Sequence, residues 1–167
     1  MLTQSVRLLS LVFTALILGG AFCHVLEMPV KLTLAGAEYM VVQQIYGAFG
    51  PVGAVLEPAA ILSSAALAFL VRGRRSFVPA IAGTVALTAA LLLWFLVVSP
   101  VNAHWAAAGP GAVPPEFESL RARWEWGHAA HAALLFVAFL ALAVSVLLEI
   151  PPRAAVRARR STAERAA

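Results

Sequence analysis

Residues 77–98 read FVPAIAGTVALTAALLLWFLVV, an apolar run that contains no charged side chain. A helix of about 20 such residues crosses the hydrocarbon core of a bilayer, which is about 30 Å thick. Three further apolar stretches of similar length flank it, at residues 6–25, 52–71 and 127–148. The sequence therefore predicts an all-α fold, an integral membrane bundle of four helices.

The composition excludes an ordinary soluble protein. Of the 167 residues, 62% are hydrophobic and 12% are charged, whereas about a quarter of the residues in a soluble domain are charged. The four stretches occupy most of residues 1–150, which we predict to form one transmembrane domain, followed by a basic cytoplasmic tail at 151–167. The isoelectric point of about 10.2 comes from basic residues that flank the spans, so we expect contact with membrane lipids and not with nucleic acid.

Lysine and arginine are distributed unequally between the two sides of the predicted membrane. One side carries Arg7, Arg72, Arg74, Arg75, Arg153, Arg157, Arg159, Arg160 and Arg165, and the other carries Lys31, Arg121 and Arg123. Because positively charged segments stay in the cytoplasm, we expect a protein of the bacterial cytoplasmic membrane with both termini inside. Trp105, Trp124 and Trp126 flank the outer ends of the third and fourth stretches, which is typical of an aromatic belt at the membrane surface.

Two longer connections join the stretches on the predicted outer side. Residues 26–50 are too polar to span the bilayer and end at the pair Gly50-Pro51, which favours a break. Residues 100–115 are rich in Pro, Gly and Ala, which predicts a loop. Residues 114–116 (Pro-Pro-Glu) are typical of a helix start, and we expect that helix to continue into the fourth span.

Polar side chains gather at one depth of the predicted bundle. The histidines of the chain, two acids and an amide fall at the outer ends of the spans: His24, His104, His128, His131, Glu27, Glu125 and Asn102. Glu57 lies about six residues into the second span, about 9 Å below its outer end at about 1.5 Å per residue. An ionised carboxylate is costly there, so we expect Glu57 to be protonated, paired or bound to a metal.

The spacing of these residues favours a metal site. His24 and Glu27 are three positions apart, and so are Glu125 and His128, which places each pair on one side of its helix. In di-iron carboxylate bundles, Glu-x-x-His pairs on two helices combine with a Glu from each of the others. The predicted metal ligands are therefore His24, Glu27, Glu57, Glu125 and His128. Imidazole and carboxylate together suit iron or copper, with zinc as a further option.

A second polar stripe leads into the second span. It consists of Tyr39, Gln43, Tyr46, Gly50, Gly53 and Glu57, which follow one another at three or four positions. If the helix continues through Gly50-Pro51, the stripe forms a pocket wall. If the proline breaks the helix, the residues before it form an amphipathic helix in the membrane interface. For the pocket, the candidate catalytic groups are Glu57, Tyr46 and Asn102, and the candidates for contacting a cofactor or substrate are Gln43, Tyr39 and His131.

Structural roles are open alternatives for several of these residues. His104 suits an interfacial loop, and His131 suits a hydrogen bond between helices. Glu125 has Arg121 and Arg123 nearby in sequence, so it would alternatively form an ion pair with one of them at the solvent-exposed surface. Glu57 is the hardest to explain by packing alone, because carboxylates within a membrane mark functional sites.

Residues 120–130 (LRARWEWGHAA) resemble the anthrone-oxygenase-like family of small four-span membrane proteins, most specifically at residues 124–128 (WEWGH). Residues 101–103 (VNA) and 24–29 (HVLEMP) extend the resemblance, and so does the four-helix hydropathy profile. The resemblance implies oxidation of anthrone-type aromatic carbons to quinones by molecular oxygen. The family commonly has arginine where this chain has His131.

Together these features predict a membrane-embedded, metal-dependent oxidoreductase of the oxygenase type. Its substrate would be a lipophilic, phenolic or anthrone-like molecule bound at the outer end of the bundle, with oxygen as the second substrate. One alternative is an electron carrier that holds haem between histidines of facing helices. Another is a non-enzymatic membrane subunit or lipid-binding protein whose polar cluster fixes helix packing. Each of these is compatible with a homo-oligomer.

Overall fold

The computed structural model describes residues 1–109 and 111–150 and contains helices but no strand in that part of the chain. The helical elements are α1 (Leu2–Lys31), α2 (Gly36–Val42), η1 (Gln43–Ala48), α3 (Phe49–Leu70), α4 (Phe77–Leu93), η2 (Trp94–Val98), α5 (Ser99–Ala108) and α6 (Phe117–Leu147). They form four helical segments long and apolar enough to cross a membrane: Leu2–Lys31, Gly36–Leu70, Phe77–Ala108 and Phe117–Leu147. The predicted all-α fold, a membrane bundle of four helices, is confirmed.

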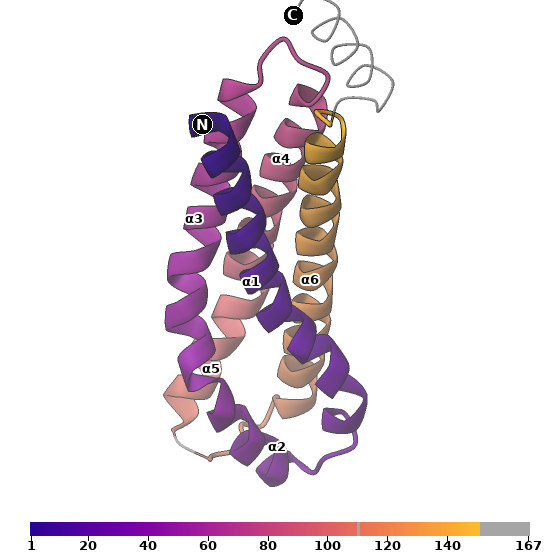
Figure 1. Cartoon of the computed structure of the whole chain (residues 1–167). Coiled ribbons are helices and arrows are strands. Elements are labelled where there is room, and N and C mark those ends of the chain that lie inside the picture. The colour runs from indigo at the N-terminus through magenta and orange to yellow at the C-terminus, as the bar shows by residue number, and fades with distance from the viewer. Residues whose placement is uncertain (110, 151–167) are drawn as a thin grey trace, which may run out of the picture.

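The four long segments run antiparallel to their neighbours (Figure 1). α1 packs against α3 and α6, and α4 packs against the same two helices, which closes the bundle into a ring. The start of α1 and the end of α6 lie at one end of the bundle, called here the terminus end. α2 lies across the opposite end, called here the α2 end (Figure 1).

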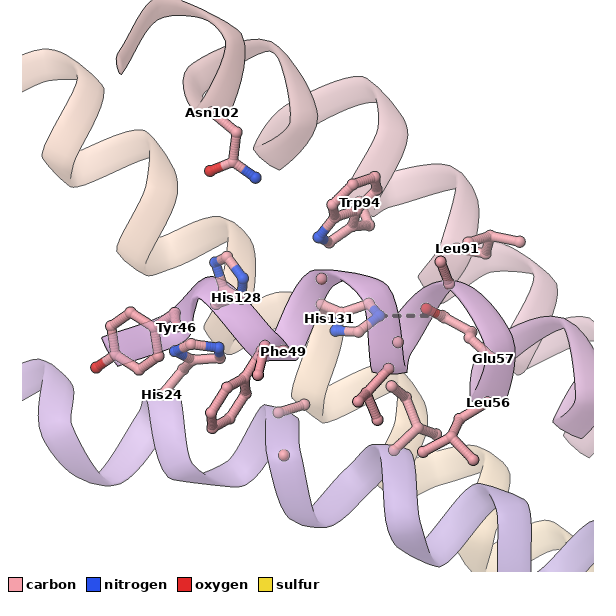
Figure 2. Close-up of a pocket in the computed structure, with 18 of the residues that line it drawn as sticks. His24, Tyr46, Phe49, Leu56, Glu57, Leu91, Trp94, Asn102, His128 and His131 are labelled. Carbon is pink, nitrogen blue, oxygen red and sulfur yellow. Dashed lines mark hydrogen bonds and ion pairs between the residues drawn. The ribbon is translucent and has the colours of Figure 1, made fainter. Parts of the chain in front are cut away.

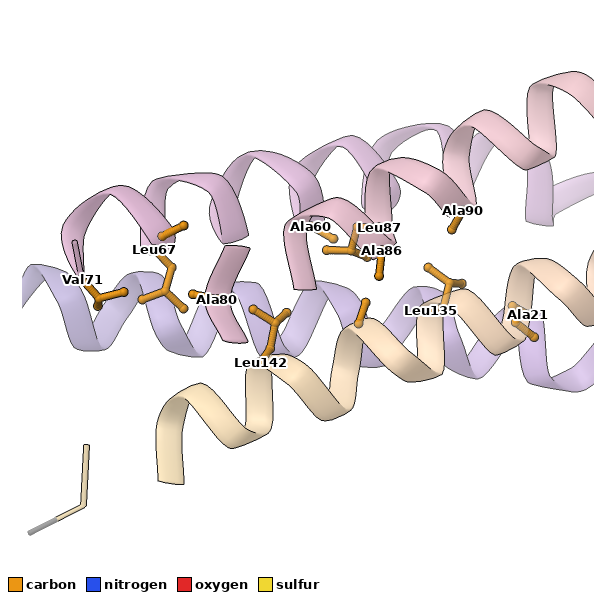
Figure 3. Packing of buried hydrophobic residues seen from close by; sticks show 13 residues of the cluster. Ala21, Ala60, Leu67, Val71, Ala80, Ala86, Leu87, Ala90, Leu135 and Leu142 are labelled. Carbon is orange, nitrogen blue, oxygen red and sulfur yellow. The ribbon is translucent and has the colours of Figure 1, made fainter. Parts of the chain in front are cut away.

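Small side chains let the helices approach closely in the half of the bundle near the termini (Figure 3). The buried core there combines alanines with a few leucines: Ala60, Ala80, Ala86, Ala90, Leu67, Leu87, Leu135 and Leu142. At Gly83 of α4, a Cβ atom would lie 2.8 Å from Cγ of Leu142 on α6, so glycine is needed for this contact. Such packing of small residues is how helices associate where lipid removes the hydrophobic driving force.

The two long connections are more helical than we predicted. Residues 26–50 contain the end of α1, then α2 and η1, which leads directly into α3. Pro51 lies in the first turn of α3, where its missing N–H would have no helical partner anyway, so the Gly50-Pro51 pair does not break the segment. The predicted loop at 100–115 is wrong over α5, which begins at Ser99 with Pro100 in its first turn. The predicted helix start is confirmed, because α6 begins directly after Glu116, which occupies the N-cap position, and continues unbroken to Leu147.

A polar network ties three elements together at the terminus end. The carboxylate of Glu149, just after α6, lies 3.3 Å from the guanidinium of Arg7 and 3.5 Å from that of Arg74. It also accepts a hydrogen bond of 2.6 Å from the hydroxyl of Ser76. This hydrogen bond, with help from Arg7 and Arg74, holds the pKa of Glu149 below its ordinary value. The predicted basic tail at 151–167 lies outside the described residues.

Candidate functional site

A cavity of about 620 Å³ lies inside the half of the bundle nearest the α2 end (Figure 2). All four long segments contribute to its wall. Its polar and aromatic lining consists of His24, Gln43, Tyr46, Phe49, Glu57, Trp94, Phe95, Asn102, Trp105, Trp124, His128 and His131. The predicted stripe lines the cavity from Gln43 to Glu57, whereas Tyr39, its first member, is fully buried behind the wall.

Two departures from regular α-helix shape this cavity. η2 is a single π-helical turn between α4 and α5, and its Trp94 and Phe95 line the cavity. Such wider turns are frequent at functional sites because they redirect side chains. On the opposite side, the 3₁₀ turn η1 brings Gln43 and Tyr46 into the wall before α3 begins.

Glu57 of α3 is paired with His131 of α6. Oε1 of Glu57 lies 3.0 Å from Nε2 of His131, and both residues are only 4% exposed. Of the three states predicted for Glu57, the structure contains the paired one, and His131 takes the interhelical hydrogen bond (Figure 2). An ionised carboxylate can only accept a hydrogen bond, so when Glu57 is ionised and His131 is neutral, the imidazole hydrogen lies on Nε2 and the lone pair on Nδ1. Nδ1 is buried and has no hydrogen-bond partner among the described residues.

His24 and His128 face each other from α1 and α6. Their ring centroids are 4.3 Å apart and their planes are inclined by 55°, which is direct contact. Nδ1 of His128 lies 3.0 Å from the carbonyl oxygen of Trp124, so it carries the hydrogen that this oxygen accepts. Rings in contact leave no room for a metal ion between them, so this pair does not fit the predicted alternative of a haem clamped by two histidines.

Glu125 belongs to a buried ion pair that the sequence analysis missed. One of its oxygens lies 2.8 Å from Nζ of Lys31 and accepts a hydrogen bond of 2.7 Å from the hydroxyl of Tyr39. The Lys31 ammonium also donates to Oε1 of Gln43, at 2.9 Å, and lies 4.1 Å from the centre of the Trp124 ring. Lys31 is 3% exposed and Glu125 is 1% exposed.

The predicted surface partners of Glu125 are wrong. Arg121 instead binds the carbonyl oxygen of Leu34 and the carboxylate of Glu118, and Arg123 binds the carbonyl oxygen of Leu96. The signal that could have indicated Lys31 is its spacing. It follows His24 by seven positions and Glu27 by four, on a helix that we ended too early.

Three of the predicted metal ligands, His24, Glu57 and His128, line the cavity, whereas Glu27 and Glu125 do not. Glu125 binds an ammonium and a phenol through one oxygen, while its other oxygen is buried with no hydrogen-bond partner among the described residues. Glu57 is bound to His131, and Glu27 is half-buried outside the cavity wall. Among residues 1–109 and 111–150, no group of three or more His, Cys, Asp or Glu side chains is arranged to hold a metal ion. The donor set in this arrangement therefore does not fit a carboxylate-bridged centre, and metal binding stays a prediction.

The aromatic belt is a further correction. Only Trp126 is exposed, at 65%, as a membrane-surface tryptophan would be. Trp105 and Trp124 are buried at 8% and 3% and line the cavity. The indole N–H of Trp124 donates to Oδ1 of Asn102 at 2.9 Å, which joins α6 to α5 beside the cavity. His104, on the same helix as Asn102, is exposed and does not line the cavity.

Several buried polar atoms in the cavity wall have no hydrogen-bond partner among the described residues. They are Nδ1 of His24, the hydroxyl of Tyr46, Nε1 of Trp105 and Nδ1 of His131. More than nine-tenths of buried polar groups in proteins are paired, because leaving one unpaired costs about 1–3 kcal/mol. Unpaired atoms that share one cavity are what a bound molecule with polar groups would satisfy.

Comparison with known protein families, with curated proteins and with solved structures finds no match for this chain. The chemistry of the cavity is therefore the basis for inferring a function.

Proposed function

We propose that this protein is a membrane-embedded oxidoreductase of the oxygenase type, which oxidises a lipophilic, phenolic or anthrone-like substrate in the cavity. The observation that carries the proposal is the Glu57–His131 pair, a carboxylate-oriented imidazole whose second nitrogen is unpaired inside an aromatic cavity. The resemblance of residues 120–130 to the anthrone-oxygenase-like family supports the same reaction class.

The size and lining of the cavity suit such a substrate. Ligand-binding cavities commonly measure about 300–1,000 Å³ and combine apolar walls with a few polar groups. A volume of about 620 Å³ accommodates a flat molecule of three fused rings. Trp94, Trp105 and Trp124 give the wall an aromatic surface suited to an aromatic substrate. The hydroxyl of Tyr46 and Nδ1 of His24 are free to hydrogen-bond a carbonyl or phenol oxygen.

His131 is the proposed general base. Glu57 holds Nε2–H of the imidazole, fixes the orientation of the ring and stabilises the cation that forms when Nδ1 takes a proton. The proton would come from a phenol, or from a methylene carbon conjugated with a carbonyl group as in anthrone. Loss of that proton leaves an electron-rich anion, the form of the substrate that oxygen oxidises most readily.

The overall reaction balances with molecular oxygen as the oxidant. The methylene group of anthrone becomes a carbonyl, one oxygen atom of O₂ enters the product, and the other leaves as water with the two methylene hydrogens. The residues of the cavity bind and orient the substrate and move its proton. The metal ion predicted from the sequence remains a separate prediction, and no step above requires it.

The proposal is tested with anthrone as the probe and the full chain in phospholipid nanodiscs. Wild-type protein should form anthraquinone with equimolar oxygen uptake. His131→Gln keeps a hydrogen bond to Glu57 but cannot take a proton, so it should lower the rate by about 100-fold or more. His104→Gln is the matched control, because His104 is exposed and does not line the cavity.

Two outcomes would overturn the proposal. Equal rates for His131→Gln and wild type would remove the base from the mechanism. Tight binding of anthrone without conversion by wild-type protein would instead favour the non-enzymatic, lipophile-binding alternative.

A further inference from the structure

The cavity is closed toward the α2 end of the bundle. α2 lies across this end (Figure 1), and a cluster of aromatic and apolar residues fills the space beneath it. The cluster consists of Tyr39, Met40, Val98, Val101, Trp105, Phe117 and Trp124, each at most 9% exposed. The Lys31–Glu125 ion pair lies next to this cluster and would have to break to open a path through the α2 end. The cluster and the ion pair therefore obstruct entry of a water-borne substrate at the α2 end.

The cavity reaches the surface at the side of the bundle. Most residues that both line it and are exposed come from two segments, and Leu16 of α1 is a further one. They are Gly47, Ala48, Phe49, Gly50, Val52 and Ala54 from η1 and α3, and Phe95 and Asn102 from η2 and α5. Gly47, Gly50 and Ala54 leave gaps between the larger side chains of the η1–α3 rim, and Phe95, 56% exposed, stands on the other rim.

The other edge of α3 is packed more tightly. There, a Cβ atom on Gly20 of α1 would lie 3.8 Å from the ring of Phe49, and one on Gly53 would lie 3.6 Å from the side chain of Ile17. Both distances are ordinary van der Waals contact, and α1 and α3 pack along their length. α3 has no comparable packing against η2 or α5, so the space between α3 and the η2–α5 segment is the less covered one.

The surroundings of this opening are those of a lipid-facing surface. Large apolar side chains next to it are exposed on the same helices: Val52 at 54%, Val55 at 69%, Leu92 at 56% and Leu96 at 70%. Both helices belong to segments that are long and apolar enough to cross a membrane. Exposed apolar side chains on such segments face acyl chains.

We infer that the substrate enters the cavity sideways from the bilayer, between Gly47 and Ala54 on one side and Phe95 on the other. This inference rests on the proposed function and narrows its substrate class: the molecule is one that partitions into the hydrocarbon core, not a water-dissolved anion or sugar. It also explains why the polar atoms in the wall are few and lie deep, at His24, Tyr46 and His131, where they contact the substrate only after entry.

The rim offers substitutions that narrow the opening without disturbing the core. A Cβ atom on Gly47 would meet nothing within 4 Å, and Ala54 is exposed, so Gly47→Phe and Ala54→Phe each place a ring at the rim. Gly50 is unsuitable because it precedes Pro51, and a side chain there would strain the helical backbone. Matched controls are Gly19→Phe, at an exposed glycine on α1 with equally open surroundings, and Ala133→Phe, at an exposed alanine on α6. Neither control position lines the cavity.

The experiment measures anthrone binding to the full chain in phosphatidylcholine nanodiscs by stopped-flow quenching of tryptophan fluorescence. Gly47→Phe and Ala54→Phe should slow association and dissociation alike, by about tenfold, while Kd changes little, because a narrowed entrance affects both directions equally. Both controls should keep the wild-type rates.

The outcomes separate the inference from the function on which it depends. Rim variants with wild-type rates, or variants that weaken Kd without slowing association, would overturn lateral entry and leave the proposed function intact. Absence of binding by the wild-type protein would overturn the proposed function, and lateral entry with it.

Discussion

Lys31 is the residue on which the closed end of the cavity depends most. Its ammonium group is buried against the Glu125 carboxylate, the side-chain oxygen of Gln43 and the face of Trp124. A buried charge is tolerated when it is paired and hydrogen-bonded, and it becomes costly when its partner is removed. Glu125 is thus required to keep Lys31 in place, and Lys31 in turn helps to hold the aromatic wall.

We expect Glu125→Gln to destabilise the protein by about 3–5 kcal/mol, since it leaves the Lys31 charge buried without a counter-ion. Glu118→Gln is the matched control on the same helix, because Glu118 pairs with Arg121 but its side chain is 74% exposed. Loss of that exposed pair should cost at most about 1 kcal/mol. Free energies of unfolding from denaturation in mixed micelles test this. Equal losses for the two variants would contradict the buried-pair account, and partial recovery in Lys31→Met/Glu125→Gln would support it.

The role of a single residue was predictable where its position within the membrane allowed few kinds of interaction. Glu57 stands out in the sequence because any carboxylate deep in a span needs a partner, and the structure supplies His131. The partner itself was not predictable, because it depends on which faces of α3 and α6 meet. Trp105 and Trp124 were misplaced for a related reason. A tryptophan near a span end suits the membrane interface and a buried wall equally, and only the helix that packs over it decides between them.

At the scale of elements, hydropathy located all four long segments but ended several of them too early. α1 continues to Lys31, because His24 and Lys31 at this end are buried by neighbouring elements. α5 extends the third segment to Ala108 and buries Val101 and Trp105. The π-helical turn at Trp94–Val98 leaves no trace in an apolar sequence. Local composition therefore determined the segments, whereas tertiary contacts determined their ends and irregularities.

The Glu149 network predicts a pH dependence for the terminus end. The folded-state pKa of this carboxyl is lowered, first by the hydrogen bond from Ser76 and then by Arg7 and Arg74. Its contribution is therefore fully present above the ordinary value of 4.5 and is lost as the pH falls through the lower, folded-state pKa. When the pH is lower than the folded-state pKa, we expect the midpoint of thermal unfolding in detergent to be a few degrees lower than at neutral pH. The Glu149→Gln variant should have a lower unfolding midpoint at neutral pH, and its midpoint should decline less as the pH falls. A decline equal to that of the wild type would rule out this network as the source of the pH dependence.

At the scale of the whole molecule, the bundle has two chemically different ends. The described part of the terminus end carries Arg7 and the basic connection with Arg72, Arg74 and Arg75, whereas the α2 end covers the cavity. We propose that the terminus end lies in the cytoplasm, as the distribution of arginine favours. A reporter fused after Arg75 should then be active in its cytoplasmic form, and one inserted at Gly109 in its external form. The reverse pattern would place the cavity near the cytoplasmic surface.

We propose that the protein oxidises a lipophilic aromatic substrate in its cavity with molecular oxygen, using His131 as the base. This proposal is tested by mass spectrometry of the anthraquinone formed from anthrone under oxygen-18 gas, with wild-type protein and His131→Gln compared in nanodiscs. The proposal predicts that wild-type protein rapidly yields product with one labelled oxygen, and that His131→Gln yields labelled product about as slowly as nanodiscs without protein. Product that forms equally fast in all three samples would contradict the claim.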